Sequence, residues 1–405
     1  MFGKKNNIIT GLDIGSDKIK VLVVTRGEED TDFEVLACAT RPSAGVRKGI
    51  VVKPDELAEE INLLIEEAEN ASGYEIDSVF SNINGSHINI ESSHGMIAVS
   101  RADREISQED VNRVIQNAQT VSIPSNREIL DVFPKEFIVD GEAGIKEVLG
   151  MKGTRLETDV LLLSVLSPYL QNLTKAILSA DLQLADLRYS SVAAAESVLT
   201  NKKKELGVAL IDIGAETTGL VVFEEEKLIH SAVIPIGSNH ITNDIAIALK
   251  CDIALAEKIK REYGVCMRAK KKKGRYKKKK IEISDSLSFS EKMLIDVIEA
   301  RVSEIFDQVN KELKKISRQK LLPAGIVLVG GGSKISKIKD LAKRDLKLPC
   351  KIGKPRGFVG LEKDPSLASV CGLVSDGEGY ETDRVFSGSR GATSKIKRFF
   401  RIFIP

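Results

Sequence analysis

One short pattern occurs twice in this chain of 405 residues: strand-forming residues, an aspartate, a glycine turn, and more strand-forming residues. The first copy contains Asp13 and Gly15, and the second contains Asp212 and Gly214. A glycine turn between two strands makes a β-hairpin, and the backbone N–H groups of such a turn can converge on an anion. Two copies separated by half the chain predict two related lobes with a polyphosphate held between the hairpins.

Size and composition favour a cytosolic protein of more than one domain. A chain of 405 residues exceeds the size at which one hydrophobic core keeps growing. The formal net charge of +2 gives no electrostatic case for a nucleic acid partner. The five cysteines show no Cys-x-x-Cys spacing, which favours reduced thiols over disulfides or a zinc site. The N-terminus runs into the first strand and no apolar run approaches ~20 residues, so we expect neither a signal peptide nor a membrane span.

The two hairpins supply the first candidate ligands of a nucleotide. Asp13 and Asp212 are predicted to hold Mg²⁺ through water, because Mg²⁺ gives up its hydration shell reluctantly. Glycine allows the backbone to approach phosphate closely, and hydroxyl or ammonium groups beside it can contact the phosphate oxygens. The predicted phosphate contacts are Gly15, Ser16 and Lys18 in the first hairpin and Gly214, Thr217 and Thr218 in the second.

Two further segments predict contacts to the nucleoside. The turn Gly330, Gly331, Gly332 and Ser333 follows a buried strand and would let adenine or ribose lie on bare backbone. Glu257 and Lys260 stand at i and i+3 on one helix face, where a ribose could be held. Each segment alone also fits an ordinary turn or a surface ion pair. The order of all four elements along the chain favours a nucleotide site.

These elements resemble the phosphate and adenosine motifs of the actin, Hsp70 and sugar-kinase superfamily. Within it, the chain is similar to the bacterial FtsA family of cell-division proteins over nearly its full length, including residues 41–51 and the block 234–246. The resemblance implies ATP and Mg²⁺ as ligands and adds Gly237 and Asn239 of that block to the nucleotide site. It also implies an α/β, actin-like two-lobed fold of duplicated ribonuclease-H-like halves, a small inserted α+β domain and a C-terminal amphipathic helix.

The same resemblance divides the chain into predicted subdomains. A capping box at Ser107–Asp110 marks the start of a helix within the insert. The predicted parts are a first lobe at 1–83, 158–205 and 355–373 (subdomain 1A); an insert at 84–157 (1C); a second-lobe core at 206–240 and 320–354 (2A); a nucleotide-side subdomain at 241–319 (2B); a flexible linker at 374–393; and a terminal helix at 394–405.

Two departures from the superfamily pattern bear on catalysis. Glu216 and Gly219 stand where the second phosphate loop is expected to carry glycine and aspartate. Residues 189–192 include no Gln, Glu or Asp where related ATPases carry a residue that positions water. Because phosphoryl transfer needs a placed water, we expect slow or no hydrolysis and leave the catalytic residues open. ATP would then act as a conformational ligand that stabilises the closed cleft.

The C-terminal twelve residues form an amphipathic pattern. At 100° per residue the apolar side chains gather on one face and the cations on the other, except that Ile402 lies among the cations. This pattern suits the interface of an anionic membrane. The alternative is a terminal helix that packs on the protein's own core. The predicted membrane residues are Ile396, Phe399, Phe400, Phe403 and Ile404, with Lys397, Arg398 and Arg401 opposite.

The basic run Lys270–Lys280 is most simply a solvated loop, although a second contact with lipid or with an acidic partner stays open. The FtsA resemblance implies a protein that tethers FtsZ filaments to the cytoplasmic face of the membrane at the division site. It also implies recruitment of later division proteins and self-association into filaments, with no nucleic acid partner. Two alternatives stay open: a PilM-like scaffold of pilus assembly, and an ATPase or kinase that uses the same cleft.

Overall fold

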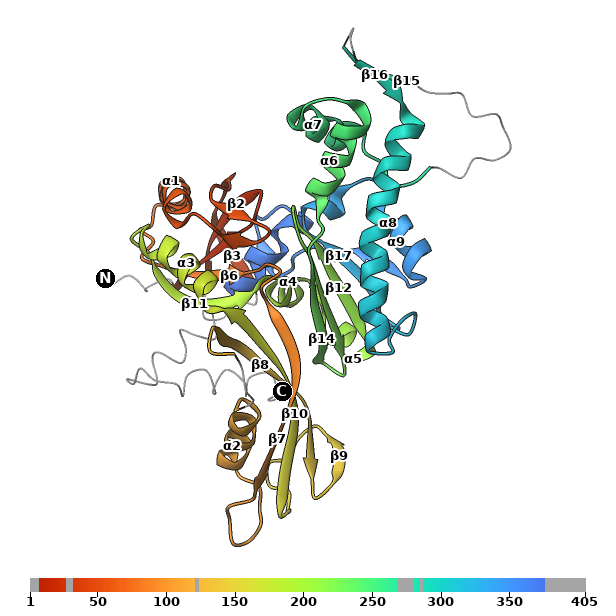
Figure 1. Ribbon diagram of the computed structural model, residues 1–405. Coiled ribbons are helices and arrows are strands. Elements are labelled where there is room, and N and C mark those ends of the chain that lie inside the picture. The colour runs from red at the N-terminus through yellow and green to blue at the C-terminus, as the bar shows by residue number, and fades with distance from the viewer. Residues whose placement is uncertain (1–6, 27–31, 121–123, 269–279, 285–286, 376–405) are drawn as a thin grey trace.

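The computed structural model describes residues 7–26, 32–120, 124–268, 280–284 and 287–375 (Figure 1). Two α/β lobes lie side by side, a small insert projects below the first lobe, and a mainly helical part projects above the second. The predicted terminal helix at 394–405, the linker from residue 376 onward and Lys270–Lys279 lie outside the described residues.

The first lobe is built on a six-stranded sheet that contains the first hairpin. Apolar residues alternate with the pleat, so that Leu12 and Val21 face one side while Ile9 and Leu22 face the other. Helices α1 (Pro54–Ser72) and α3 (Ser167–Leu178) pack against the first of these sides. Across the sheet, the strands are β11 (Gln183–Tyr189), β6 (Ser78–Ile83), β1 (Asn7–Ile14), β2 (Lys18–Arg26), β3 (Phe33–Pro42) and β19 (Phe358–Val359).

The end of the described chain covers the second side of this sheet. A short 3-10 helix, η2 (Pro365–Leu367), leads into a helix at 368–375 whose apolar residues pack against β1 and β2. Val374 is fully buried, and its Cγ1 lies so close to Gly11 that a Cβ there would be 2.9 Å away. The first two residues assigned to the linker, 374 and 375, are therefore part of the lobe.

The second lobe repeats this design with a five-stranded sheet. Its apolar residues form a core with the long helix α8 (Glu291–Lys315) and with α9 (Ile338–Leu346). Helices α6 (Ser238–Leu249) and α7 (Ile253–Tyr263) and the strands β15 (Lys280–Ser284) and β16 (Leu287–Ser290) lie above it (Figure 1). Across the sheet, the strands are β14 (Lys227–Ile234), β13 (Thr218–Glu224), β12 (Val208–Ile213), β17 (Gly325–Val329) and β18 (Cys350–Ile352).

Helix α4 (Ser190–Val198) joins the two lobes and is buried along its length. One hydrophobic core includes its apolar residues, the first-lobe sheet and residues of β12, β13 and β17. The helix at 368–375 crosses α4 at Gly372, where an added Cβ would lie 1.7 Å from the carbonyl oxygen of Ala193. Backbone-to-backbone contact of this kind requires glycine, so the crossing fixes α4 against the first lobe. The short α5 (Asn201–Leu206) follows.

The insert is a four-stranded antiparallel sheet covered by α2 (Gln108–Ala118). The predicted capping box is confirmed: the Ser107 hydroxyl accepts from the Asp110 N–H, and the Ser107 N–H donates to the Asp110 carboxylate. Burial raises the pKa of Asp110, but hydrogen bonds from Ser107 and Ser100 outweigh this and lower it to about 2. The strands, in order, are β7 (Asn89–Ala98), β10 (Arg155–Leu166), β8 (Arg127–Val139) and β9 (Glu142–Ile145).

Strand β10 leads directly from the insert into α3 of the first lobe, and it crosses the boundary predicted at 157/158 without a break. At this junction Arg127 donates to the backbone oxygens of His87 and Ser164, at 2.8 and 2.9 Å. These bonds connect the start of β8 to β10 and to the loop before β7. The insert is therefore attached to the first lobe through a hydrogen-bonded strand junction.

On the exposed face of the insert, His94 lies between two carboxylates, with Nδ1 2.8 Å from Asp159 and Nε2 3.1 Å from Glu157. The hydrogen bond with Asp159 is the main reason that the pKa of His94 is raised above its usual value. A raised folded-state pKa contributes stability that is present below about pH 6.5 and is lost as the pH rises through the folded-state pKa. We therefore expect His94→Gln to destabilise the insert at pH 6 but not at pH 8.5.

Hydrogen exchange of β7 and β10 amides in the wild type and the variant, corrected for the intrinsic rate at each pH, checks this expectation. The effect should be below about 1 kcal/mol, since a solvent-exposed ion pair contributes little. An equal difference between the two proteins at both pH values would contradict it.

Candidate nucleotide-binding site

The two predicted hairpins have the same backbone geometry. The Gly15 N–H donates to the Lys18 carbonyl at 3.1 Å, and the Gly214 N–H donates to the Thr217 carbonyl at 2.9 Å. In both turns an added Cβ would lie within 3.0 Å of that same carbonyl oxygen, so glycine is required at both positions. The repeated sequence pattern therefore corresponds to a repeated structure, one copy in each lobe.

The two aspartates are brought close together, with Lys20 beside them. The Lys20 Nζ lies 2.5 Å from an Asp13 carboxylate oxygen. Burial and the neighbouring Asp13 carboxylate raise the pKa of Asp212 to about 6, although Lys20 and Ser369 oppose the shift. Burial lowers the pKa of Lys20, but attraction to Asp13, Asp212 and Asp364 outweighs it and raises that pKa. The site therefore holds two carboxylates that repel each other and an ammonium group that attracts both.

Asn82 of β6 organises the Asp13 side of the site. Its Nδ2 donates to Asp13 at 2.7 Å and to the Ser190 hydroxyl at 2.8 Å, and its Oδ1 accepts from the Ile14 N–H at 2.7 Å. Sequence analysis did not identify Lys20, Asn82 or Ser190. A hairpin pairs its residues in a fixed register, and this register places Lys20 opposite Asp13. The register was therefore the signal that could have identified Lys20.

The other two predicted phosphate contacts of the first hairpin, Lys18 and Ser16, differ from each other: Lys18 is exposed, and Ser16 is hydrogen-bonded to a neighbouring turn. Lys18 is exposed at the turn, on the same face of β2 as Lys20 but farther from the aspartates along the strand. The Ser16 hydroxyl accepts a hydrogen bond from the Gly49 N–H at 2.8 Å. Ser16 therefore lies between the tip of the first hairpin and the turn that contains Gly49.

In the second hairpin the predicted threonines are buried and hold the local structure. The Thr218 hydroxyl donates to the Ile236 carbonyl at 2.7 Å, and the Thr217 hydroxyl accepts from Asn84 of the first lobe at 3.3 Å. Gly237 packs on the hairpin tip, where a Cβ would lie 2.6 Å from Ala215. The Asn239 N–H donates to the Ala215 carbonyl at 2.7 Å. These residues fix the start of α6 to the hairpin.

The glycine turn after β17 lies against the second hairpin. A Cβ on Gly330 would be 2.3 Å from an Asp212 carboxylate oxygen, whereas one on Gly331 would meet no atom within 4 Å. The Ser333 hydroxyl donates to the Gly330 carbonyl at 2.7 Å and is buried. Gly331 is thus the member of the turn with open space beside it, while Gly332 packs on Ile213 and Ser333 closes the turn.

Glu257 and Lys260 form an ion pair of 2.6 Å within a larger network at the α6–α7 contact. The Thr242 hydroxyl donates to Glu257 at 2.6 Å, and Lys260 donates to the Ser238 carbonyl at 3.2 Å. Burial raises the pKa of Glu257, but hydrogen bonds from Lys260, Thr242 and Arg261 outweigh it and lower it to about 2. Lys260 is 7% exposed, so the pair connects α6 to α7 and is not a solvated surface pair.

Comparison with known proteins identifies the family. A family model for cell division protein FtsA matches residues 209–372, and one for the SHS2 domain inserted in FtsA matches residues 85–164. The cell division protein FtsA of Pseudomonas aeruginosa is 36% identical over 397 residues, which cover 96% of this chain and 94% of that protein. The FtsA of Bacillus subtilis is 34% identical over 91% of this chain and 83% of that protein. The chain belongs to the FtsA family.

Solved structures confirm the actin-like two-lobed fold, and the family model over residues 85–164 confirms the insert. A PilM–PilN type IV pilus biogenesis complex matches at a TM-score of 0.67 and 20% identity, covering 91% of this chain and 98% of that one. MreB5 of Spiroplasma citri bound to ADP matches at 0.55 and 13%, covering 94% and 99%. At these identities the likeness shows the fold alone. The FtsA assignment rests on the sequence relatives, which leave the PilM-like alternative without support.

The donor set of this FtsA-family site fits a divalent cation bound through water. The Asp13 carboxylate repels that of Asp212 and contributes to the raised pKa of Asp212, and a bound cation would relieve this repulsion. Within the described ranges no group of three His, Cys, Asp or Glu residues could coordinate a metal directly. Among the described helices none is long and apolar enough to cross a membrane.

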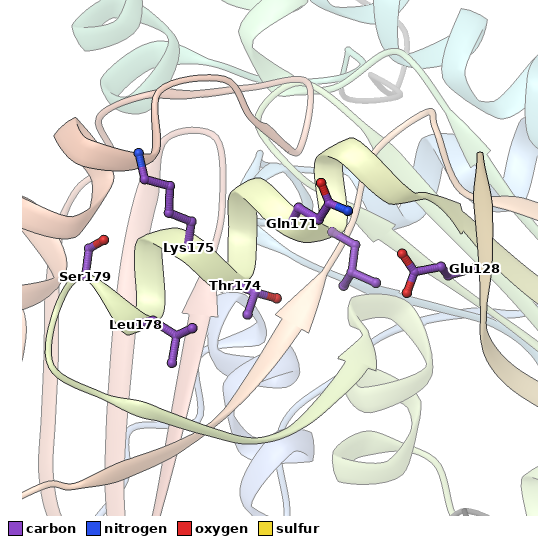
Figure 2. Close-up of a pocket in the computed structure, with 7 residues that line it drawn as sticks. Glu128, Gln171, Thr174, Lys175, Leu178 and Ser179 are labelled. Carbon is purple, nitrogen blue, oxygen red and sulfur yellow. The ribbon is translucent and has the colours of Figure 1, made fainter. Parts of the chain in front are cut away.

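A separate groove lies away from the hairpins, between α3 and the start of β8 (Figure 2). Its volume is about 620 Å³. Leu178, which is 55% exposed, lines one end, and Glu128 lies at the other. The predicted nucleotide residues are not among those that line this groove: Glu128, Leu170, Gln171, Thr174, Lys175, Leu178 and Ser179.

Proposed function

We propose that this FtsA-family protein binds ATP with Mg²⁺ between its two hairpins and hydrolyses it slowly or not at all. The observation that supports this is the position of Lys20 beside Asp13, together with the electrostatic interaction of both groups with Asp212 of the other lobe. In this arrangement Lys20 would neutralise phosphate charge, while Asp13 and Asp212 would hold waters of the cation. The cation, when bound, would supply charge neutralisation for the phosphates.

The other residues of the site would support nucleotide binding without contributing charge to it. Gly15 and Gly214 shape the two turns, and Gly331, next to the Gly330 that packs on Asp212, offers open backbone for a nucleoside. Asn82 orients Asp13 by donating to its carboxylate, and the Ser190 hydroxyl holds Asn82 by accepting from the same amide. Serines occupy the start of α4, where related ATPases carry a carboxylate or amide, which supports the expectation of slow turnover. Rapid steady-state release of phosphate would instead favour an ATPase or kinase.

We further propose that the protein tethers FtsZ filaments to the cytoplasmic face of the membrane and recruits later division proteins there, with self-association into filaments. Membership of the FtsA family supports the process. The tail at 394–405 lies outside the described residues, and its aromatic and basic pattern supports the membrane contact. A chain of this kind folds on the lipid surface, since about twelve residues are too few for a stable helix in water.

FtsZ polymer is expected to pellet with anionic vesicles when the full chain is present and to stay in solution with a version that ends at Thr393. The shortened version keeps the buried helix at 368–375, so its fold should be unchanged. Neutral vesicles provide the lipid control, because binding of the cationic face depends on anionic headgroups. If the shortened version brings FtsZ to the vesicles equally well, the tethering proposal fails.

A further inference from the structure

A third turn faces the tips of the two hairpins. It connects the short strands β4 (Val46–Arg47) and β5 (Ile50–Val51), and its central residues, Lys48 and Gly49, have φ angles of 50° and 74°. Two successive left-handed residues between paired strands make a tight turn with outward-facing N–H groups. The Gly49 N–H donates to Ser16 of the first hairpin, and the Lys48 N–H donates to the Glu216 carboxylate of the second.

The surroundings hold this turn in place. A Cβ on Gly49 would lie 2.9 Å from the backbone of Gly85, so the turn packs directly on the loop after β6. Asn84 of the same loop donates to Thr217, which adds a second contact between the lobes at this point. The Lys48 N–H is therefore a fixed donor, and Glu216 reaches it from the opposite lobe.

The Glu216 carboxylate would lie beside a phosphate bound at Ser16. A phosphate in contact with Ser16 would lie next to the Lys48 N–H, because Ser16 and Glu216 bind adjacent amides of one turn. It would also meet the Glu216 carboxylate, and like charges brought together at a binding site oppose association. The superfamily pattern leads one to expect glycine at this position of the second phosphate loop, and this chain carries glutamate there.

We propose that Glu216 lowers the affinity of the cleft for a nucleotide more strongly the more phosphates the nucleotide carries. It does so by occupying the Lys48 N–H and repelling the outermost phosphate. This inference rests on the proposed nucleotide site. A nucleoside triphosphate must displace the Glu216 carboxylate from the turn. A diphosphate displaces it only in part, and a monophosphate does not reach it. Glu216 is thus a specificity-determining residue that weakens ATP binding relative to AMP.

Titration calorimetry of the full chain with ATP, ADP and AMP tests the proposal in three proteins: wild type, Glu216→Gln and Glu216→Gly. Both variants are expected to bind ATP about tenfold more tightly than the wild type, because both remove the negative charge that opposes the phosphate, and tenfold corresponds to about 1.4 kcal/mol. The gain should be smaller for ADP and within about twofold of unity for AMP. Glu226→Gln, an exposed site in the turn between β13 and β14, is the control and should change none of the three affinities.

The experiment is repeated in Mg²⁺ and in EDTA, and the gain should appear in both. Weaker ATP binding by the variants would overturn the proposal, since it would mean that Glu216 closes the cleft around the nucleotide. If the variants bind ATP more weakly only when Mg²⁺ is present, the proposal is overturned in favour of Glu216 as a cation ligand. If the variants bind all three nucleotides as the wild type does, the proposal is overturned because Glu216 has no role in selectivity. Absence of saturable ATP binding by the wild type would refute the nucleotide site itself, which separates that failure from the failure of this inference.

Discussion

Replacement of Lys20 by methionine is expected to weaken ATP binding by about a hundredfold. Methionine keeps the length and apolar stem of the side chain but leaves Asp13 and Asp212 without the ammonium group that lies beside them. Truncating one partner of a buried charge pair costs ~2–5 kcal/mol, and 1.4 kcal/mol corresponds to a tenfold change in affinity. Calorimetric titration with ATP measures the effect.

Lys18→Met is the matched control, because Lys18 is on the same face of the same strand but is exposed. A screened surface charge contributes little, so a loss below about threefold is expected. Equal losses in the two variants would contradict the central position of Lys20. Lys20→Met also removes the group that opposes the raised pKa of Asp212, so that pKa should rise further above about 6 in the variant. Infrared or NMR titration of the carboxylates reports this independently of nucleotide.

Gly372→Ala is expected to be the most destabilising of the substitutions considered, by about 3 kcal/mol. The added Cβ would lie 1.7 Å from the carbonyl oxygen of Ala193 and 2.2 Å from its carbonyl carbon. Both atoms are backbone in α4, so a side-chain rotation cannot relieve the overlap and the two helices must separate. Urea unfolding should show a lower midpoint with an unchanged slope, the sign of lost stability without a change in the exposed surface.

Gly331→Ala is the comparison for this variant, since a Cβ at Gly331 meets no atom within 4 Å. Its stability should lie within about 0.5 kcal/mol of the wild type. Should Gly372→Ala unfold at the wild-type midpoint, the close crossing of α4 and the helix at 368–375 would be refuted.

The hairpins could be predicted because their signal is local: an apolar strand, an aspartate, a glycine and a second strand all lie within residues 7–26 in the first copy and 208–224 in the second. Residue type and strand face do not separate Lys18 from Lys20, because both are lysines on one face of β2. Only the hairpin register, which pairs Asp13 with Lys20, separates them, and the prediction did not use it. Asn82 is 69 residues from Asp13 and gives no local signal at all. Its role depends on the parallel pairing of β1 with β6.

Some predicted ligands proved to have structural partners of their own. The hydroxyl groups of Ser333 and Thr218 donate to carbonyls within their own lobe, a use that residue type alone does not distinguish from phosphate binding. Glu257 and Lys260 do pair as their spacing predicts, yet the burial of Lys260 depends on how α7 packs against α6. Pairing at i and i+3 is a property of one helix, whereas burial depends on its neighbours.

The packing of residues 367–374 on β1 and β2 has a consequence for synthesis of the protein. The ribosome releases β1 first, but the apolar side chains of Ile9 and Leu22 gain their covering helix only after residue 374 has emerged. The second lobe, encoded between these two segments, is complete sooner. The nascent chain must therefore keep one side of its earliest sheet uncovered through most of translation, and a ribosome stalled before this point would present that apolar surface to chaperones.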